Sequence, residues 1–117
     1  MPQTVRDMVR EIQREALSPA DLTPDRAAEM LMTLAALISN VAEEIRNADQ
    51  EYAVTLLHFL DVEKKANRAR IRAEISSEYR RKQEARDTKE LVMELIRSLK
   101  YLMRAKQDEY HYAGHQR

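Results

Sequence analysis

Cysteine is absent from this chain of 117 residues, glycine occurs once, at Gly114, and the three prolines all lie before residue 25. Without cysteine the chain forms no disulfides and offers no thiol chemistry. The scarcity of glycine argues against β-rich and Rossmann-type folds, because their turns need residues that adopt positive φ. Alanine, leucine, glutamate, arginine and lysine, which favour helices, dominate the rest. The composition therefore predicts an all-α fold, with a single helical domain over residues 1–117.

Long apolar runs and catalytic motifs are also missing. The longest apolar-leaning stretch, Met30 to Ile38, is too short to cross a bilayer, and the N-terminus lacks a basic-then-apolar signal pattern. We therefore expect a cytoplasmic protein with no membrane partner. The sequence has no glycine-rich phosphate loop and no nucleophile–base set in a recognisable context. We expect no enzyme activity, no cofactor and no small-molecule substrate.

Two histidines near the C-terminus, His111 and His115, are four residues apart, a spacing that puts both imidazoles on one side of a helix. Gly114 lies between them, and no third ligand is evident. We therefore predict no metal site there, and a frayed tail over residues 113–117.

Local signals divide the first part of the chain into two helical segments. Thr4 can cap a helix over about residues 4–17. A Ser-Pro step then ends this helix and begins a linker over residues 18–23. Thr23 and Pro24 form a second start signal, because a hydroxyl cap is followed by proline at the first helical position.

From residue 24 onward, apolar residues recur with the 3–4 spacing of a heptad seam. The members of this seam are Leu31, Leu34, Ile38, Val41, Ile45, Ala48, Tyr52, Thr55, Phe59, Val62, Ala66, Ala69 and Ala73. A second seam, in another register, comprises Ala85, Thr88, Val92, Leu95, Leu99 and Leu102. The phase changes at Ser76-Ser77, where either serine can cap a new helix. We therefore predict a coiled-coil-like antiparallel hairpin with a long helix over about 24–75 and a return helix over about 77–112. A single bent helix through both seams is the alternative.

The lengths of these two helices predict an association surface. At about 1.5 Å per residue, the long helix would extend about 75 Å and the return helix about 54 Å, so the return helix would end level with residue 40. The apolar stretch 24–39 would then lie partly bare, because the stripe of helix 4–17 is too narrow to cover it. We predict a homodimer or higher oligomer through residues 24–45. The predicted interface comprises Met30, Leu31, Leu34, Leu37, Ile38, Val41 and Ile45.

Charge is unevenly distributed, although the net charge is zero. Residues 1–63 hold five basic and twelve acidic side chains, whereas residues 64–86 hold nine basic and three acidic ones. The nine cations flank the predicted turn: Lys64, Lys65, Arg68, Arg70, Arg72, Arg80, Arg81, Lys82 and Arg86. They would suit the phosphates of a nucleic acid or the carboxylates of an acidic protein. Alternatively they form a solvated face and pair with Glu63, Glu74, Glu78 and Glu84. Tyr79 is the sole aromatic residue among them, which gives base stacking little support.

Three segments resemble small coiled-coil proteins encoded by bacteriophages. They are Arg70-Ile71-Arg72-Ala73-Glu74, then Ser77-Glu78-Tyr79, and later Glu94-Leu95-Ile96-Arg97-Ser98-Leu99-Lys100-Tyr101-Leu102. In such proteins an RAE-x-S-x-EY stretch precedes an LIRSLKY-like stretch. The resemblance covers about residues 40–112 and leaves the first helix unmatched. Many such genes lie in early or recombination cassettes. The resemblance thus implies an accessory role near DNA transactions or host-defence proteins, in the cytoplasm of a bacterial host cell.

These observations lead to two functional expectations. The first is a non-enzymatic helical binding or assembly protein, which docks onto a protein partner or its own copies by its helix faces. The alternative is a nucleic-acid-binding accessory factor of recombination or replication, which uses the basic end of the hairpin.

Overall fold

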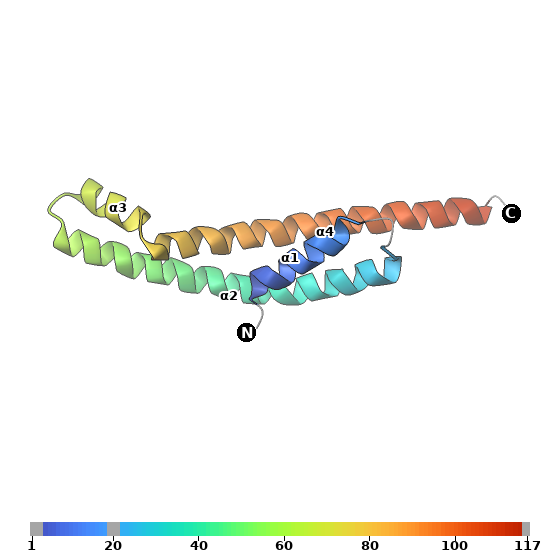
Figure 1. Ribbon diagram of the computed structural model, residues 1–117, viewed down its shortest axis with the longest axis horizontal. Coiled ribbons are helices and arrows are strands. Elements are labelled where there is room, and N and C mark those ends of the chain that lie inside the picture. Colours follow the sequence, from blue (N-terminus) through green and yellow to red (C-terminus); the bar gives the residue numbers. More distant parts are fainter. Residues whose placement is uncertain (1–3, 19–21, 116–117) are drawn as a thin grey trace. The chain divides into compact units, whose positions relative to one another are not determined.

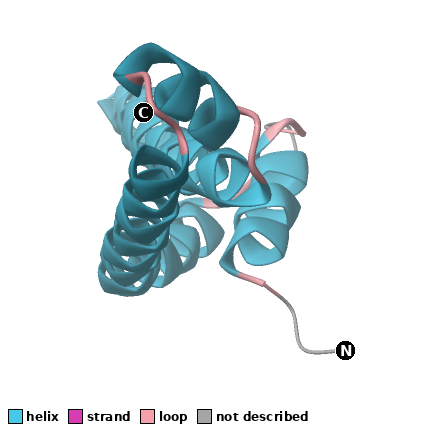
Figure 2. Ribbon diagram, turned by 90° about the vertical axis from the view of Figure 1, so that its left-hand side faces the viewer, coloured by secondary structure: helices cyan, strands magenta, loops and turns pink. Residues whose placement is uncertain are grey.

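The all-α prediction is confirmed. The computed structural model describes residues 4–18 and 22–115, and describes side chains as far as residue 108. These ranges contain four helices, α1 (Val5–Ala16), α2 (Pro24–Val62), α3 (Ala66–Glu74) and α4 (Ser77–His115) (Figure 1). Outside the helices the described chain forms only turns and loops, without any strand (Figure 2). Within these same ranges, no helix combines the length and the apolar character that a bilayer-crossing segment needs.

The first two helices begin where the sequence predicts. The Thr4 hydroxyl accepts a hydrogen bond from the Asp7 backbone N–H at 3.1 Å, and the Asp7 carboxylate accepts one from the Thr4 backbone N–H at 3.3 Å. This reciprocal pair is a capping box. At α2 the Thr23 hydroxyl accepts from the Arg26 backbone N–H at 3.1 Å. Pro24 takes the first helical position, where no backbone donor is needed.

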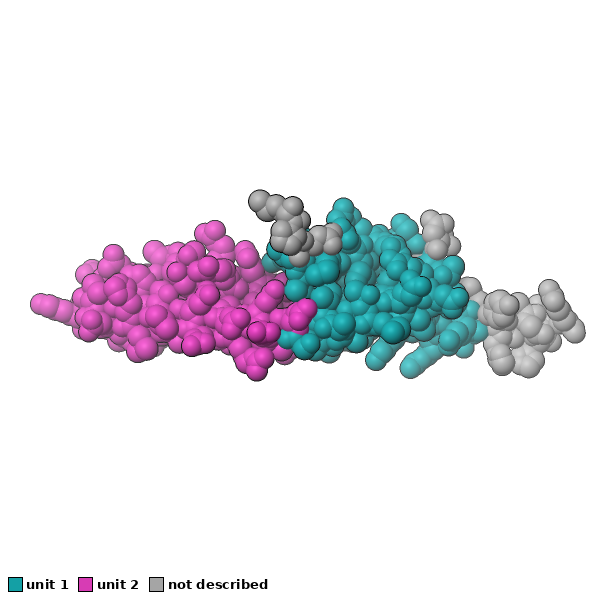
Figure 3. All heavy atoms as spheres, turned by 90° about the horizontal axis from the view of Figure 1, so that it is seen from below, with its two compact units in different colours: residues 1–39, 90–117 teal, residues 40–89 magenta. Residues whose placement is uncertain are grey.

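The chain divides into two compact units, which share the long helices (Figure 3). Unit 1 comprises residues 1–39 and 90–117, and unit 2 comprises residues 40–89. Unit 1 thus combines α1, the beginning of α2 and most of α4. All three helices contribute to its apolar core, which is made of Val5, Val9, Ile12, Leu22, Ala27, Met30, Leu34, Leu37, Val92, Leu95 and Leu99.

Unit 2 is an antiparallel hairpin. Asp49 of α2 contacts Arg86 of α4, and Glu51 contacts Arg81. Nearer the turn, the Tyr52 ring lies 5.3 Å from the ring of Tyr79. Residue numbers fall along α4 as they rise along α2, which is the pattern of two antiparallel neighbours. The hairpin prediction is therefore confirmed, and the single bent helix is wrong.

The position of the reversal was predicted wrongly. The chain turns back at residues 63–65, between α2 and α3, and not at the two serines. The backbone N–H of Glu63 still donates to the Phe59 carbonyl at 2.8 Å, after which Lys65 is extended, with φ −110° and ψ 128°. The predicted helix 24–75 is thus two helices.

The seam itself explains why the turn comes early. Beyond Val62 its members are all alanines, which would bury little surface if the helix continued straight. By turning back, α3 buries Ala69 and Ala73 completely. Arg72 holds the reversal, because its Nη1 lies 2.5 Å from the Glu63 carboxylate and its guanidinium carbon lies 5.4 Å from the centre of the Phe59 ring.

The serine pair marks a second break, between α3 and α4. The Ser76 hydroxyl accepts from the Tyr79 backbone N–H at 3.2 Å and donates to the Ala73 carbonyl at 2.5 Å. The prediction that one of these serines caps a helix is confirmed for Ser76. The return helix begins at Ser77 as predicted but continues to His115, three residues beyond the predicted end, so residues 113–115 are helical.

Candidate binding surfaces

The predicted oligomer interface lies mostly inside the chain. Met30, Leu34, Leu37 and Val41 are buried, Leu31 and Ile45 are half-buried, and Ile38 alone is substantially exposed. The expectation that the stretch 24–39 lies partly bare therefore holds only for its outer residues, such as Met32 and Ile38, whereas its inner residues are covered within the chain. Because the chain reverses at 63–65, α4 reaches this stretch within unit 1, and α1 adds its own apolar stripe. Association through residues 24–45 stays a prediction, with four of its seven named residues buried within the chain.

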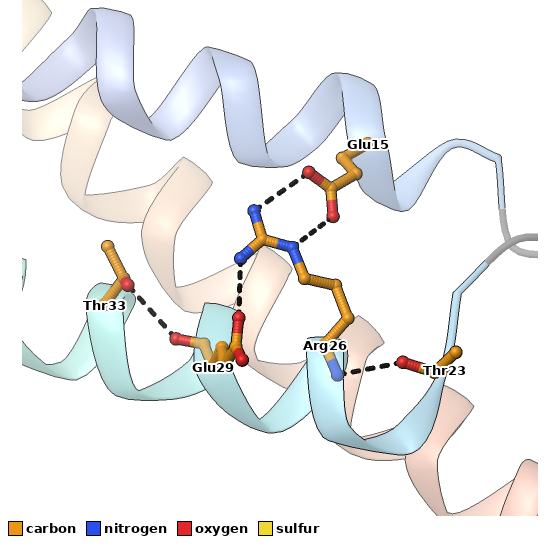
Figure 4. A network of polar contacts seen from close by, with 5 residues as sticks. All are labelled: Glu15, Thr23, Arg26, Glu29 and Thr33. Carbon is orange, nitrogen blue, oxygen red and sulfur yellow. Dashed lines mark hydrogen bonds and ion pairs between the residues drawn. The ribbon is translucent and has the colours of Figure 1, made fainter.

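A salt-bridge cluster ties α1 to α2 within unit 1 (Figure 4). The Arg26 guanidinium contacts the Glu15 carboxylate at 2.5 and 3.0 Å and the Glu29 carboxylate at 2.9 Å. Its hydrogen bonds to Glu15 hold the pKa of that carboxyl below the usual value. Glu29 also accepts the Thr33 hydroxyl at its backbone carbonyl. All these charges have partners within the chain, and the cluster connects α1 to α2.

Four of the nine predicted cations are engaged within unit 2. Besides Arg72 at the turn, Arg86 pairs with Asp49 at 2.9 Å. Arg81 lies 3.6 Å from Glu51 and 3.4 Å from Glu78. The ammonium of Lys82 lies 4.5 Å from the centre of the Tyr52 ring. Of the four glutamates proposed as partners, Glu63 and Glu78 take that role. Asp49 and Glu51 were missed, because only the antiparallel alignment brings them to α4.

The other cations remain without an ion-pair partner among the residues described. They are Lys64, Lys65, Arg68, Arg70 and Arg80, all exposed. Burial raises the pKa of the Tyr52 phenol, and the positive charge of Arg70 partly opposes that rise. The structure thus separates the basic run into charges engaged within the chain and charges without an ion pair among the described residues.

Aliphatic side chains interrupt these free charges on α3. Ile71 is 62% exposed and Ile75 is 78% exposed. Arg68, Ile71 and the C-cap residue Ile75 follow one another at three and four residues, a spacing that keeps them on one side of α3 and its C-terminal end. The buried residues Ala69 and Ala73 lie on the opposite side. We call Arg68, Ile71 and Ile75, together with the N-cap residue Lys65 at the start of the helix, the α3 outer face. From the sequence, the two isoleucines were not identified as exposed. Their positions are out of phase with the alanines of the seam, and this spacing could have predicted their exposure.

The one aromatic side chain of the basic run is occupied. The Tyr79 ring packs against Tyr52, and the Tyr79 hydroxyl accepts a hydrogen bond from the Gln83 side chain at 2.8 Å. Burial raises the pKa of the Tyr52 phenol, and the charges of Glu74 and Tyr79 raise it further. Tyr79 is therefore part of the packing between α2 and α4, and its ring is not presented to a nucleic acid base.

An open groove of about 500 Å³ lies in unit 2. Its walls come from α2 and the start of α4, through Asn47, Gln50, Glu51, Val54, Thr55, Glu78 and Arg81. The lining is a mixture of two amides, three ion-paired charges, one threonine hydroxyl and one aliphatic side chain. Across the described ranges, no group of three or more histidine, cysteine, aspartate or glutamate side chains is arranged to hold a metal ion. His111 and His115 have side chains outside the described part.

Comparisons with protein-family models, with curated proteins and with solved structures found no match for this chain.

Proposed function

We propose that this chain is a non-enzymatic helical binding protein, which docks through its α3 outer face onto an acidic and apolar surface of a protein partner. One observation carries the proposal: Arg68, which has no acidic partner in the described chain, shares a face of α3 with the exposed Ile71, and the exposed Ile75 and Lys65 lie at the C-cap and N-cap of the same helix. This is also the kind of accessory role that the resemblance to phage-encoded coiled-coil proteins implies.

The energetics favour a partner that offers both kinds of contact. Full burial of an isoleucine side chain is worth roughly 1.5–3 kcal/mol, and α3 leaves two of them in water. Cations around an apolar centre direct the approach of an acidic partner and set its orientation. A helix with aliphatic residues on one side and carboxylates along the edges supplies both, because its anchors recur at the same three- and four-residue spacing.

The test uses a designed helical peptide with leucines on one face and glutamates flanking them, labelled for fluorescence anisotropy. We expect it to bind the wild-type chain. Ile71→Ser/Ile75→Ser and Lys65→Glu/Arg68→Glu should each weaken binding at least tenfold. Met32→Ser, which alters an equally exposed side chain in unit 1, should leave binding unchanged. Binding that ignores the isoleucines would contradict the proposal.

A nucleic-acid-binding accessory factor is the second candidate. It is supported by the exposed cations without acidic partners, which include Lys64, Arg68 and Arg80. It is weakened by the packing of Tyr79 against Tyr52. A duplex DNA probe should then bind more weakly as salt rises, with a slope set by the number of phosphate contacts. Arg68→Glu/Arg80→Glu should abolish binding, while Ile71→Ser/Ile75→Ser should not affect it. Absence of binding at low salt would discard this candidate.

A further inference from the structure

The turn between α2 and α3 carries two consecutive lysines outside any helix. Lys64 and Lys65 are both exposed. Every other lysine and arginine of the described ranges lies within a helix. Proteases cut folded chains preferentially at exposed turns, because helical backbone does not fit a protease cleft. Among the described basic residues, these two lysines are therefore the best placed for cleavage by a protease.

The peptide bond between the two lysines is free of internal contacts. Neither the Lys64 carbonyl nor the Lys65 N–H forms a hydrogen bond with a described residue. Lys65 is extended, with φ −110° and ψ 128°, which is the backbone form that a bound strand adopts. The Lys65 carbonyl, in contrast, accepts the Ala69 N–H at 3.1 Å. Cleavage after Lys64 therefore requires less of α3 to unwind than cleavage after Lys65.

We propose that the Lys64–Lys65 bond is a processing site for an endoprotease that cleaves after lysine, and that α3 unwinds locally to admit the enzyme. Such an enzyme carries an acidic residue in the pocket that receives the side chain before the cut. The reaction is a hydrolysis, with water as the only co-reactant. The water hydroxyl bonds to the Lys64 carbonyl carbon, which becomes a carboxylate, and a proton goes to the Lys65 nitrogen, which leaves as an amine.

The short helix α3 is suited to local unwinding. A protease holds residues on both sides of the cut in extended form, so the start of α3 must open together with the turn. With nine residues, α3 is shorter than the about 12–15 residues that a lone helix needs. Its buried side chains are Ala69 and Ala73, which cover little apolar surface, and Arg72 anchors it to Glu63 and Phe59. Segments with so few buried contacts open without global unfolding.

Cleavage at this bond would leave two fragments that stay together. Residues 1–64 contain α1 and α2, and residues 65–117 contain α3 and α4. The core of unit 1 joins the two fragments through the fully buried Leu34 and Leu99. In unit 2, Asp49 and Arg86 pair across the same two fragments. The cut would thus release one end of α3 and leave the packing of α2 with α4 in place.

The first experiment treats the folded full chain with a small amount of a lysine-specific endoprotease and follows intact masses. The chain has six lysines, and the four outside the turn all lie in α4. We expect 1–64 and 65–117 to appear at least tenfold faster than any product of a cut in α4. Lys64→Gln should slow the first cut at least tenfold. Lys89→Gln, at an exposed position of α4, is the matched control and should not change it. A first cut in α4, or a cut that Lys65→Gln slows more than Lys64→Gln, overturns the proposal.

A second experiment tests the unwinding of α3. Arg72→Ala removes the contacts with Glu63 and Phe59 and should speed the cut at least threefold. Arg68→Ala, which removes an exposed side chain of the same helix, should leave the rate unchanged. Far-UV circular dichroism checks the helix content of both variants. An unchanged rate in Arg72→Ala would show that α3 does not control access, contrary to the proposal.

Gel filtration of the cleaved chain tests the last step. Both fragments should elute together as one species, and their separation would contradict the proposal. All these readouts are masses and elution volumes, which do not depend on peptide binding at the α3 outer face. The two proposals therefore fail separately.

Discussion

Nη2 of Arg86 lies 2.9 Å from Oδ2 of Asp49, an ion pair that joins residues 37 positions apart in the sequence. The other carboxylate oxygen of Asp49 is buried and has no hydrogen-bond partner in the described chain. The pair thus fixes which turn of α4 faces which turn of α2. Its energy is modest, because both side chains are more than a third exposed.

We expect Arg86→Ala to lower the free energy of unfolding more than Asp49→Ala, because it leaves a partly buried carboxylate without its cation. The coupling energy between the two substitutions should be about 0.2–1 kcal/mol and should shrink as salt is added. Urea unfolding of the single and double variants measures it. No coupling at low salt would show that the pair does not form.

Leu34→Ala should destabilise the protein by about 2–5 kcal/mol, because Leu34 is fully buried and its truncation opens a cavity. Met32→Ala, two residues earlier but 74% exposed, should change the free energy of unfolding by less than about 0.5 kcal/mol. Thermal and urea unfolding compare the two. Similar small effects at both positions would mean that this stretch is not covered within unit 1.

Much of the fold could be predicted from local signals, because those signals are decided by a few neighbouring residues. Thr4 and Thr23 cap their helices as expected, and Ser76 caps α4. The turn at 63–65 has no glycine, proline or side-chain cap. It arises from the packing of Ala69 and Ala73, which heptad spacing alone does not distinguish from a continuing helix.

The surfaces were harder to predict than the helices, for a related reason. Misplacing the turn moved the apparent bare region to residues 24–39, whose inner residues α4 covers. It also hid the ion pairs of Asp49 and Glu51, since their partners depend on the alignment of α2 with α4. The cations at positions 64–68 were identified correctly as exposed, because a turn bearing three consecutive charged residues has no apolar side to bury.

Ser76→Ala should cost about 0.5–2 kcal/mol of stability, because it removes the hydroxyl that accepts the Tyr79 backbone N–H at the start of α4. Ser77→Ala should have a smaller effect, since the Ser77 hydroxyl contacts only the neighbouring Glu78 side chain. Urea unfolding of both variants separates the two roles. A larger loss of stability from Ser77→Ala than from Ser76→Ala would show that Ser77, and not Ser76, caps α4.

Stability should fall at alkaline pH partly through Tyr52. Burial raises the pKa of its phenol above the ordinary value of 10.0, so the folded chain keeps this proton to a higher pH than the unfolded chain. The contribution is complete below pH about 10 and is lost as pH rises from there through the folded pKa. Tyr52→Phe should remove that part of the decline. The phenolate absorbance of the wild type minus that of the variant gives the titration of Tyr52, and an ordinary midpoint would contradict its burial.

The reversal at residues 63–65 underlies every surface described above, and a single spin–spin distance tests it. Ala53→Cys/Arg80→Cys places two spin labels at exposed positions of an otherwise cysteine-free chain. Adjacent antiparallel helices lie about 10 Å apart, so pulsed dipolar spectroscopy should give a label separation below about 20 Å, allowing for the label arms. A turn at the serines would give about 30 Å, and an unbroken helix about 40 Å. Either longer distance would contradict the account.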